Sequence, residues 1–302
     1  MNSFFYIIIS ILLFNNLLVD DSKNEIVLAP KIENILNNES NCKECHSELI
    51  SKTNVHPVAQ DCETCHQSNG ADHSIITKAF NFTEKLPQLC YTCHDAVQSS
   101  IDKSKVIHGA ITDKKSCINC HSPHSTEVGK LLKKESKELC LSCHNKVIDA
   151  NGHKIPNIKQ KVTTAKVIHA AVEDGCITCH KPHSSDRKNL LADKFPSSEY
   201  TVVNPDSFAL CFNCHDAAMI ESATTTSATS FRSANKNLHF VHINGNKGRS
   251  CTLCHDIHGS ENEHLIKSKV LFGNYEMTQA FRSTETGGSC KNACHTEKAY
   301  ER

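Results

Sequence analysis

The hydrophobic positions of this chain form one long run near the start and only short groups afterwards. Residues Phe4–Val19 are almost uniformly apolar. Farther along, Leu131–His144 has apolar residues at helical spacing, which predicts a short helix. The segments VIHGAIT and VIHAAVE are typical of short extended stretches. Asn, Ser, Gly and Pro separate these groups, so the pattern predicts short elements joined by extensive coil.

The first apolar run, broken by Asn15 and Asn16, is short for a transmembrane helix and is typical of a signal-peptide core. No Lys or Arg precedes it and no clean small-x-small cleavage site follows, so an uncleaved N-terminal anchor is the alternative. Residues 1–19 are therefore interpreted as a signal peptide or anchor, and residues 20–41 as a linker. Either leader would export the chain to a periplasmic or extracellular location, with membrane association if the anchor is retained.

Cysteine carries the strongest chemical signal in the sequence. All 18 cysteines fall into nine pairs, and a histidine directly follows every pair. Eight pairs have C-x-x-C-H spacing: Cys42/Cys45/His46, Cys62/Cys65/His66, Cys90/Cys93/His94, Cys117/Cys120/His121, Cys140/Cys143/His144, Cys176/Cys179/His180, Cys211/Cys214/His215 and Cys251/Cys254/His255. The ninth is one residue longer, Cys290/Cys294/His295.

C-x-x-C-H spacing is the signature of covalent c-type haem attachment. The two thiols add to the two vinyl groups of the porphyrin, and the adjacent imidazole becomes an iron ligand. A zinc site does not require a histidine after every pair, and a thioredoxin-like dithiol requires one pair rather than nine. A disulfide scaffold would not place a histidine after each second cysteine. We therefore expect about nine covalently attached haem c groups, including one on the longer ninth motif.

Composition points to a fold built around cofactors. Hydrophobic residues make up 38% of the chain, aromatic residues 6%, and Trp is absent. Soluble domains usually contain about 45–50% apolar residues, so a side-chain core is undersupplied and the porphyrins must provide much of the buried apolar surface. The formal net charge is zero, with 33 basic and 33 acidic side chains, which gives no case for nucleic-acid binding.

The last eight motifs pair into four repeated units that follow the lone motif at 42–46. Each unit has an upstream His, a first motif, a downstream His, an apolar doublet and a second motif. The units span 56–94, 108–144, 169–215 and 239–295. In the last three, the downstream His follows the motif His by three residues, and the doublets are Leu131–Leu132, Leu190–Leu191 and Leu265–Ile266. In the first unit that separation is seven residues.

The segments CHSPHS, CHKPHS and CHDIHG, each with its second motif, resemble the doubled C-x-x-C-H motif of multihaem c-type cytochromes. The resemblance covers roughly residues 56–295, and the first unit and the final C-x-x-x-C-H depart from it. It implies an electron carrier of a respiratory chain, in the periplasm or associated with the outer membrane, that exchanges electrons with redox partner proteins. It also allows a subunit threaded through an outer-membrane barrel or a self-assembling filament.

Eleven of the 20 histidines lie outside the motifs, and eight of these occupy repeat positions. As iron ligands, they would supply one sixth ligand for each haem of the four units: His56, His73, His108, His124, His169, His183, His242 and His258. The ninth haem, on Cys42/Cys45, would then take its sixth ligand from among His153, His239 and His264. Besides Met1 only Met219 and Met277 are present, so His/Met ligation cannot be general and bis-histidine, low-potential haem is expected.

The short spacing after the first motif restricts which iron a downstream histidine can reach. His121 and His124 are three residues apart, and side chains at this spacing lie about 5–6 Å apart on a helical turn. His124 therefore cannot easily reach the opposite side of a haem held by His121. We expect it to bind a neighbouring haem, so that the short peptide links two porphyrins.

Residues 42–302 are expected to form one continuous array, mainly α with extensive coil, in which short helices surround closely packed haems with little regular core. The Ser/Thr-rich segment 221–233 is interpreted as a flexible insertion. The leading hypothesis is an electron carrier that is not an enzyme. The alternatives are a multihaem oxidoreductase for nitrogen compounds, with an open iron on His46, and a structural conduit or filament subunit.

The haem-free chain is predicted to be largely unfolded, because metal binding and folding are coupled in small metal-dependent domains. An NMR spectrum of the haem-free protein measures this directly. Narrow amide dispersion is expected, and a well-dispersed spectrum contradicts the prediction.

Overall fold

The structure is a computed structural model that describes residues 42–71, 73, 78–150, 152–201, 204–292 and 294–302. The chain divides into two units, Met1–Asn41 and Cys42–Arg302. The predicted leader at 1–19 and linker at 20–41 lie outside the described residues. Within the described part, no helix combines the length and the apolar character needed to cross a membrane.

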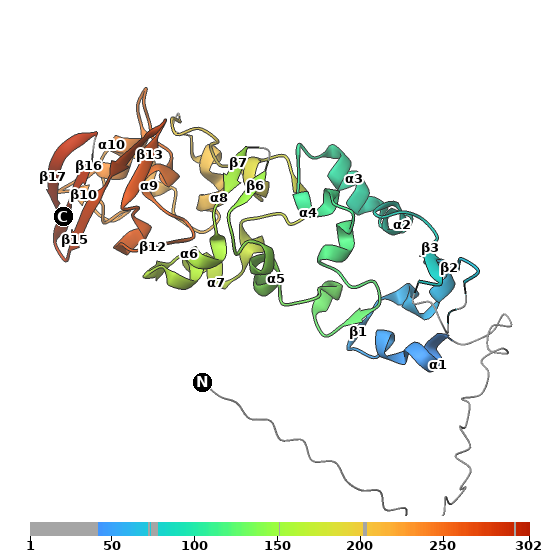
Figure 1. Cartoon of the computed structure of the whole chain (residues 1–302). Coiled ribbons are helices and arrows are strands. Elements are labelled where there is room, and N and C mark those ends of the chain that lie inside the picture. The colour runs from blue at the N-terminus through green and yellow to red at the C-terminus, as the bar shows by residue number, and fades with distance from the viewer. Residues whose placement is uncertain (1–41, 72, 74–77, 151, 202–203, 293) are drawn as a thin grey trace, which may run out of the picture. The chain divides into compact units, whose positions relative to one another are not determined.

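The described helices are short, and the elements of this unit follow one another in chain order from α1 to β17 (Figure 1). Several coincide with C-x-x-C-H motifs, as α1 and α11 do. The helices are α1 (Cys42–His46), α2 (Gln88–Tyr91), α3 (Asp95–Lys103), α4 (Gly109–Thr112), α5 (Ser136–Cys143), α6 (Ile158–Thr164), α7 (Ala170–Glu173), α8 (Ala209–Phe212), α9 (Ala218–Glu221), α10 (Leu238–Ile243) and α11 (Cys251–Cys254).

Three two-stranded antiparallel sheets join consecutive repeat units. Each pairs the residues before an upstream His with the residues after the downstream His of the next unit: β1 (Asn54–Val55) with β5 (Ser125–Thr126), β4 (Val106–Ile107) with β9 (Ser184–Ser185), and β8 (Val167–Ile168) with β12 (Gly259–Ser260). All residues of β5, β9 and β12 are buried. Isolated two-stranded sheets are marginal in water, so these depend on the units that they connect.

The other described strands form local hairpins and one larger sheet. The hairpins pair β2 (His66–Ser68) with β3 (Phe80–Phe82), β6 (Ile148–Ala150) with β7 (His153–Ile155), β10 (Arg232–Ser233) with β11 (Lys236–Asn237), and β13 (Lys269–Phe272) with β14 (Tyr275–Thr278). The larger sheet is antiparallel and contains β15 (Ala280–Thr284), β16 (Gly287–Asn292) and β17 (His295–Glu301) in that order.

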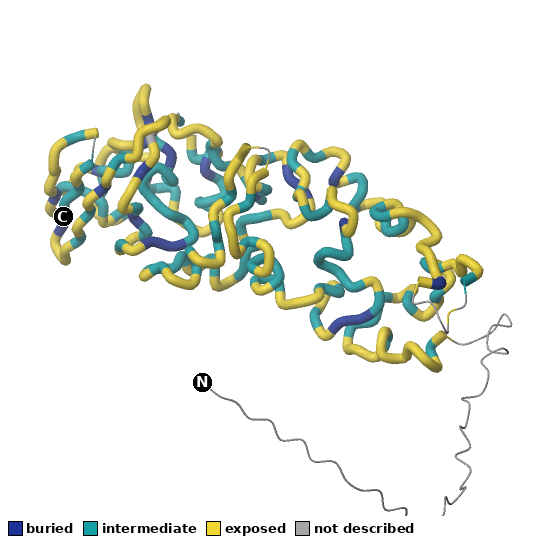
Figure 2. The backbone as a smooth tube through the Cα atoms, viewed as in Figure 1, coloured by how far each residue is buried: buried dark blue, intermediate teal, exposed yellow. Residues whose placement is uncertain are grey.

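The buried apolar core is small and discontinuous (Figure 2). Its one compact cluster among the described residues contains Phe208, just before the last motif of the third unit, and Ile220 and Ile243, which lie between that motif and the first motif of the fourth. Other buried hydrophobic residues are scattered along the described chain: Ala79, Ile101, Leu191, Ile266, Val270 and Tyr300. Side-chain packing of this extent is low for a unit of this length, which agrees with the low apolar content of the sequence.

The local elements lie partly where the hydrophobic pattern predicts them. Helix α5 occupies only the second half of Leu131–His144, because Leu131 has a left-handed backbone and Leu132 is extended. The two predicted extended stretches begin with β4 and β8 but end in the short helices α4 and α7, so only their first residues are extended. The segment 221–233 is a hydrogen-bonded loop, in which the Thr225 hydroxyl accepts from two following backbone amides. Strands of two or three residues are too short to leave an alternating pattern, so most of the other strands could not be predicted.

Candidate functional site: nine facing histidine pairs

Most C-x-x-C-H motifs share one local geometry. In six of them the carbonyl of the first cysteine accepts a hydrogen bond of 2.9–3.0 Å from the amide of the motif histidine: those of His94, His121, His144, His180, His215 and His255. This bond closes one helical turn, which places the two thiols, three residues apart, on the same side. The ninth motif differs, because Cys290 lies in β16 and His295 begins β17, so a β-hairpin carries it.

The lone motif at the start of the array lies within one short helix. Cys42, Cys45 and His46 all belong to α1, so the two predicted attachment thiols and the predicted iron ligand share a single helical segment. Both thiols are exposed. The three-residue spacing of Cys42 and Cys45 on this helix places them on the same side, as haem attachment requires. Attachment through Cys45 stays a prediction that this geometry supports.

Every motif histidine faces a second histidine from outside the motifs. The ring centroids are 5.8–6.5 Å apart in nine pairs: His46–His73, His66–His124, His94–His56, His121–His183, His144–His108, His180–His258, His215–His169, His255–His239 and His295–His242. An imidazole nitrogen binds a metal at about 2 Å, and the ring centroid lies about 1 Å behind it, so two imidazoles on opposite sides of one metal have centroids about 6 Å apart. The pairs therefore have the spacing of axial ligands and fit a haem iron.

The protonation of these rings also suits metal binding. Burial lowers the pKa of His239 and of His258 to about 4, so both rings are neutral at pH 7 and keep a free lone pair. A backbone carbonyl can only accept a hydrogen bond, so an Nδ1 that faces one carries the ring proton and leaves Nε2 free. Six paired histidines have such a carbonyl at 2.7–2.9 Å from Nδ1: His108, His121, His180, His242, His255 and His295.

The structure places all eight predicted distal histidines opposite a motif histidine. The downstream histidines of the last three units face the unit before their own. His124 lies opposite His66 and not opposite His121, the histidine three residues before it. The other two follow the same rule: His183 faces His121, and His258 faces His180.

Two distal assignments differ from the sequence-based prediction. His73 faces His46 of the lone motif, so it is not a ligand within its own unit. The predicted sixth ligand of the haem on Cys42/Cys45 therefore changes, from one of His153, His239 and His264 to His73. His239 instead faces His255.

The sequence did contain a hint that His239 faces a motif histidine. It lies three residues before His242, and that spacing places both rings on one helical turn. Two other candidates face no motif histidine among the described ring contacts: His153 and His264. The sequence reasoning failed here because it gave the eight repeat-position histidines to the eight haems of the four units, whereas one of them, His73, faces the lone motif.

The short sheets between units hold distal histidines in pairs. His56 directly follows β1 and His124 directly precedes β5, and the His56 amide donates to the His124 carbonyl at 2.7 Å. The other two sheets flank equivalent pairs, which are His108/His183 and His169/His258. Each sheet therefore positions the rings that face two consecutive motifs, and each contains backbone from two units.

Helix α10 has this role in the fourth unit. It carries both His239 and His242. The Asn237 side chain caps its first turn and donates to two carbonyls of the preceding segment at 2.9 and 3.0 Å, and this residue is 0% exposed. The Thr229 hydroxyl lies 2.9 Å from Nδ1 of His239. The segment 221–233 thus helps to orient a distal ring.

Thiols of consecutive motifs lie beside one another along the array. Four pairs of first cysteines are hydrogen-bonded: Cys42–Cys62, Cys90–Cys117, Cys140–Cys176 and Cys211–Cys251. The bond from Cys90 lowers the pKa of the Cys117 thiol to about 6. Second cysteines interact electrostatically in the alternating positions: Cys65–Cys93, Cys120–Cys143, Cys179–Cys214 and Cys254–Cys294. The nine motifs are therefore neighbours in space in the same order as in the sequence.

Cys45 stands outside this series of thiol contacts. The second cysteines interact in four motif pairs: the second with the third, the fourth with the fifth, the sixth with the seventh and the eighth with the ninth. The second cysteine of the first motif belongs to none of these described pairs. The lone motif is joined to the array through Cys42, whose thiol contacts that of Cys62. Cys45 thus differs from the other second cysteines in its surroundings and not in its place within the motif.

Comparison with known families agrees with this geometry. A family profile described as the doubled CXXCH motif matches residues 56–99, 108–149, 169–220 and 242–271, which is more than half of the chain. The chain belongs to the multihaem c-type cytochromes of this family. Its C-x-x-C-H motifs are attachment sites for covalently bound haem c. The matched segments begin after the lone motif and end before Cys290, so haem at those two motifs is supported by their own residues and geometry.

The cytochrome is also similar to the multiheme cytochrome MtrA of Shewanella baltica (strain OS185), with 28% identity over 165 residues. The aligned region is 51% of this chain and 41% of the relative. The cytochrome therefore spans less than half the length of the relative that it matches.

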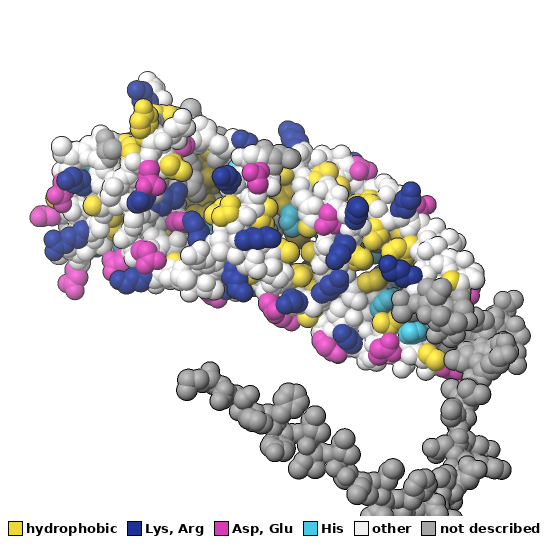
Figure 3. Space-filling model, viewed as in Figure 1, with side chains coloured by type: hydrophobic (Ala, Val, Ile, Leu, Met, Phe, Trp, Pro, Cys, Tyr) yellow, Lys and Arg dark blue, Asp and Glu magenta, His cyan; other side chains and the backbone are white. Residues whose placement is uncertain are grey.

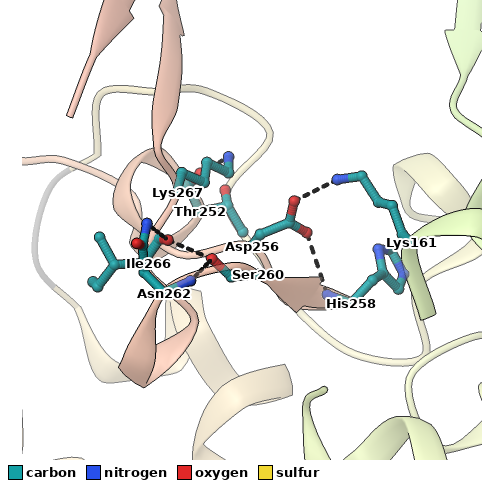
Figure 4. Close-up of polar contacts among 8 residues, drawn as sticks. All are labelled: Lys161, Thr252, Asp256, His258, Ser260, Asn262, Ile266 and Lys267. Atoms are coloured by element: carbon teal, nitrogen blue, oxygen red, sulfur yellow. Dashed lines mark hydrogen bonds and ion pairs between the residues drawn. The ribbon is translucent and has the colours of Figure 1, made fainter. Parts of the chain in front are cut away.

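A partly buried ion pair lies next to distal His258 of the cytochrome (Figure 4). The Asp256 carboxylate pairs with Nζ of Lys161, from α6, and accepts the His258 amide at 3.4 Å. The Asp256 side chain is 18% exposed and the Lys161 side chain 36%. Nearby, Nζ of Lys267 donates to the Thr252 carbonyl within the motif turn. The ion pair thus connects α6 to the backbone that carries a distal histidine.

Replacing Lys161 with Met, which keeps the aliphatic stem, is predicted to lower the free energy of unfolding of the holoprotein by about 1–2 kcal/mol, because the Asp256 charge loses its partner in a partly desolvated position. Chemical denaturation followed by haem absorbance measures the effect. Lys134→Met is the matched control, because the Lys134–Glu138 pair is exposed and contributes at most about 0.5 kcal/mol. Equal losses in the two variants contradict the prediction.

Proposed function

We propose that the protein is an electron-transfer cytochrome that carries nine bis-histidine haems in one continuous array. The nine facing histidine pairs carry this proposal, because they offer two axial ligands at every C-x-x-C-H or C-x-x-x-C-H motif. Haem c, when bound, supplies one-electron redox chemistry at its iron. The side chains of the chain attach it, ligate it and set the order of the sites.

The arrangement of the thiols supports transfer along the chain. The contacts between consecutive motifs, from Cys42–Cys62 to Cys254–Cys294, place each attachment site beside the next. The three-residue links such as His121–His124 additionally tie alternate sites together, because the two rings serve different motifs. An electron that enters at one end therefore has an unbroken series of attachment sites to follow.

Saturation of the irons favours a carrier over an enzyme. Catalysis at a haem requires an open coordination position, and the motif of His46 was the candidate for one. His73 faces His46 at 5.8 Å, so this motif has the same pair of rings as the others. We propose that the protein is not an enzyme, and that its haems have the low potentials of bis-histidine ligation.

The partners and location belong to the same proposal. Haem is attached outside the cytoplasm in cytochromes of this kind, so we propose an exported, periplasmic or extracellular protein with redox proteins as donor and acceptor. On the face shown in Figure 3, basic and acidic side chains are interspersed, so this face has no docking patch of a single charge. The paired histidines come from one chain, so ligation requires no second copy. No observation favours a barrel-threaded conduit or a filament over a free carrier.

The exported protein is predicted to contain nine haems, all of them low-spin in the oxidised state. Intact mass spectrometry gives the haem number, and EPR gives the spin state. Eight haems would mean that the hairpin motif at Cys290/Cys294 is vacant. A high-spin iron would reopen the enzyme alternative.

His124→Ala is predicted to make one of the nine irons high-spin, because the ring facing His66 is removed. The affected haem is expected to be the one on Cys62/Cys65, which lies outside the unit of His124. EPR of the oxidised variant shows the new signal. It should disappear when Cys62 and Cys65 are also replaced by Ala, and persist when Cys117 and Cys120 are replaced instead.

The reverse pattern in these triple variants contradicts the assignment. His153→Ala is the control, because His153 faces no motif histidine among the described ring contacts. This variant is expected to keep the low-spin spectrum of the parent protein.

A further inference from the structure

The apolar doublets of the last three units have an unusual backbone that the proposed function does not explain. In each unit the residue before the doublet and the first doublet residue are both left-handed, with φ of 54–57°: Lys130–Leu131, Asn189–Leu190 and His264–Leu265. Residues other than glycine seldom adopt this conformation, and Lys and Leu have no side-chain group that favours it. Two such residues in succession are strained, so the surrounding structure must hold them in place.

Each left-handed turn directs a carbonyl at the Nδ1 of a motif histidine. The distances are 2.9 Å from Lys130 to His121, 2.8 Å from Asn189 to His180 and 2.8 Å from His264 to His255. The carbonyl of the next residue accepts the amide just after the motif histidine at 2.7–2.8 Å. The amide after the doublet donates to the carbonyl of the second cysteine at 2.8–2.9 Å. Three hydrogen bonds therefore fasten each turn to its motif.

In the second unit, this arrangement distinguishes the first motif from the second. In the second unit, His121 of the first motif has the carbonyl of the turn on its Nδ1. Nδ1 of His144, in the second motif, is buried without a hydrogen-bond partner in the described structure. In the first unit, the position nine residues after His66 lies outside the described residues.

We infer that Lys130, Asn189 and His264, each with the leucine that follows, are positioning residues that set the ligand strength of three motif histidines. The inference rests on the proposed haem ligation by those histidines. The accepting carbonyl fixes the ring proton on Nδ1, orients the ring and makes the ligating nitrogen more basic. A more basic imidazole stabilises ferric over ferrous iron, so each turn lowers the reduction potential of the haem at its motif.

Substitution of exposed Lys130 tests this with little change in packing. Proline holds φ near about −65° and cannot adopt the left-handed conformation, whereas glycine adopts it freely. Lys130→Pro and Lys130→Gly both lose the lysine charge, but only the glycine variant can keep the left-handed conformation at position 130. In a potentiometric titration of the holoprotein, one haem's share of the absorbance change is expected to move to more positive potential in Lys130→Pro alone. EPR of that variant should show one low-spin signal shifted and no high-spin iron.

Identical titrations of the two variants, with nine low-spin haems in each, overturn the inference and leave the proposed function intact. A high-spin iron in the unsubstituted protein contradicts the proposed function instead. If Lys130→Pro does not mature, Asn189→Pro and Asn189→Gly repeat the comparison in the third unit, where Asn189 is also exposed. A positive shift confined to the proline variant supports the inference, and equal potentials overturn it.

Discussion

The architecture depends on one constraint: every motif histidine faces a second imidazole, with ring centroids 5.8–6.5 Å apart, and a C-x-x-C-H turn supplies only one of the two rings. The motif histidine shares its helical turn with the thiols, so the facing ring must come from elsewhere in the chain. In the last three units the ring three residues downstream is too close to face its own motif histidine, and it turns instead to the preceding unit, as His124 does toward His66. Each of the last three units therefore supplies a facing ring to the unit before it, and the repeats interlock through these histidine pairs rather than through a shared apolar core.

The backbone is organised around this exchange. The two-residue sheets that join the units lie beside the distal rings, and their strands β5, β9 and β12 are buried. Polar residues such as Ser184 and Ser185 are thus among the most buried of the described chain. Such small sheets have no independent stability. The histidines on either side belong to facing pairs, so ring pairing and backbone pairing hold the same segments together.

In the first and fourth units, the facing histidines come from different positions than in the units between them. At the start, His73 lies seven residues after its motif histidine rather than three, and it faces His46 of the lone motif. In the fourth unit, α10 carries His239 and His242 together. The regular β-structure of the described chain is concentrated there, where β16 and β17 hold the last motif. Side-chain capping by Asn237 replaces the inter-unit sheet as the element that orients the rings.

The sequence alone determined the chemistry and the repeat, because thiol and imidazole spacing within a motif is a local property of a few covalently linked residues. The motif positions, the four doubled units and the eight repeat-position distal histidines all follow from it. The pairing between distant rings was decided only in the tertiary structure, because it depends on which segments lie side by side. His239 illustrates this: its residue type made it a candidate, but only the position of α10 places it opposite His255. The left-handed turns at Lys130 and Asn189 were equally unpredictable, since neither residue type demands that conformation and the hydrogen bonds to the motif impose it.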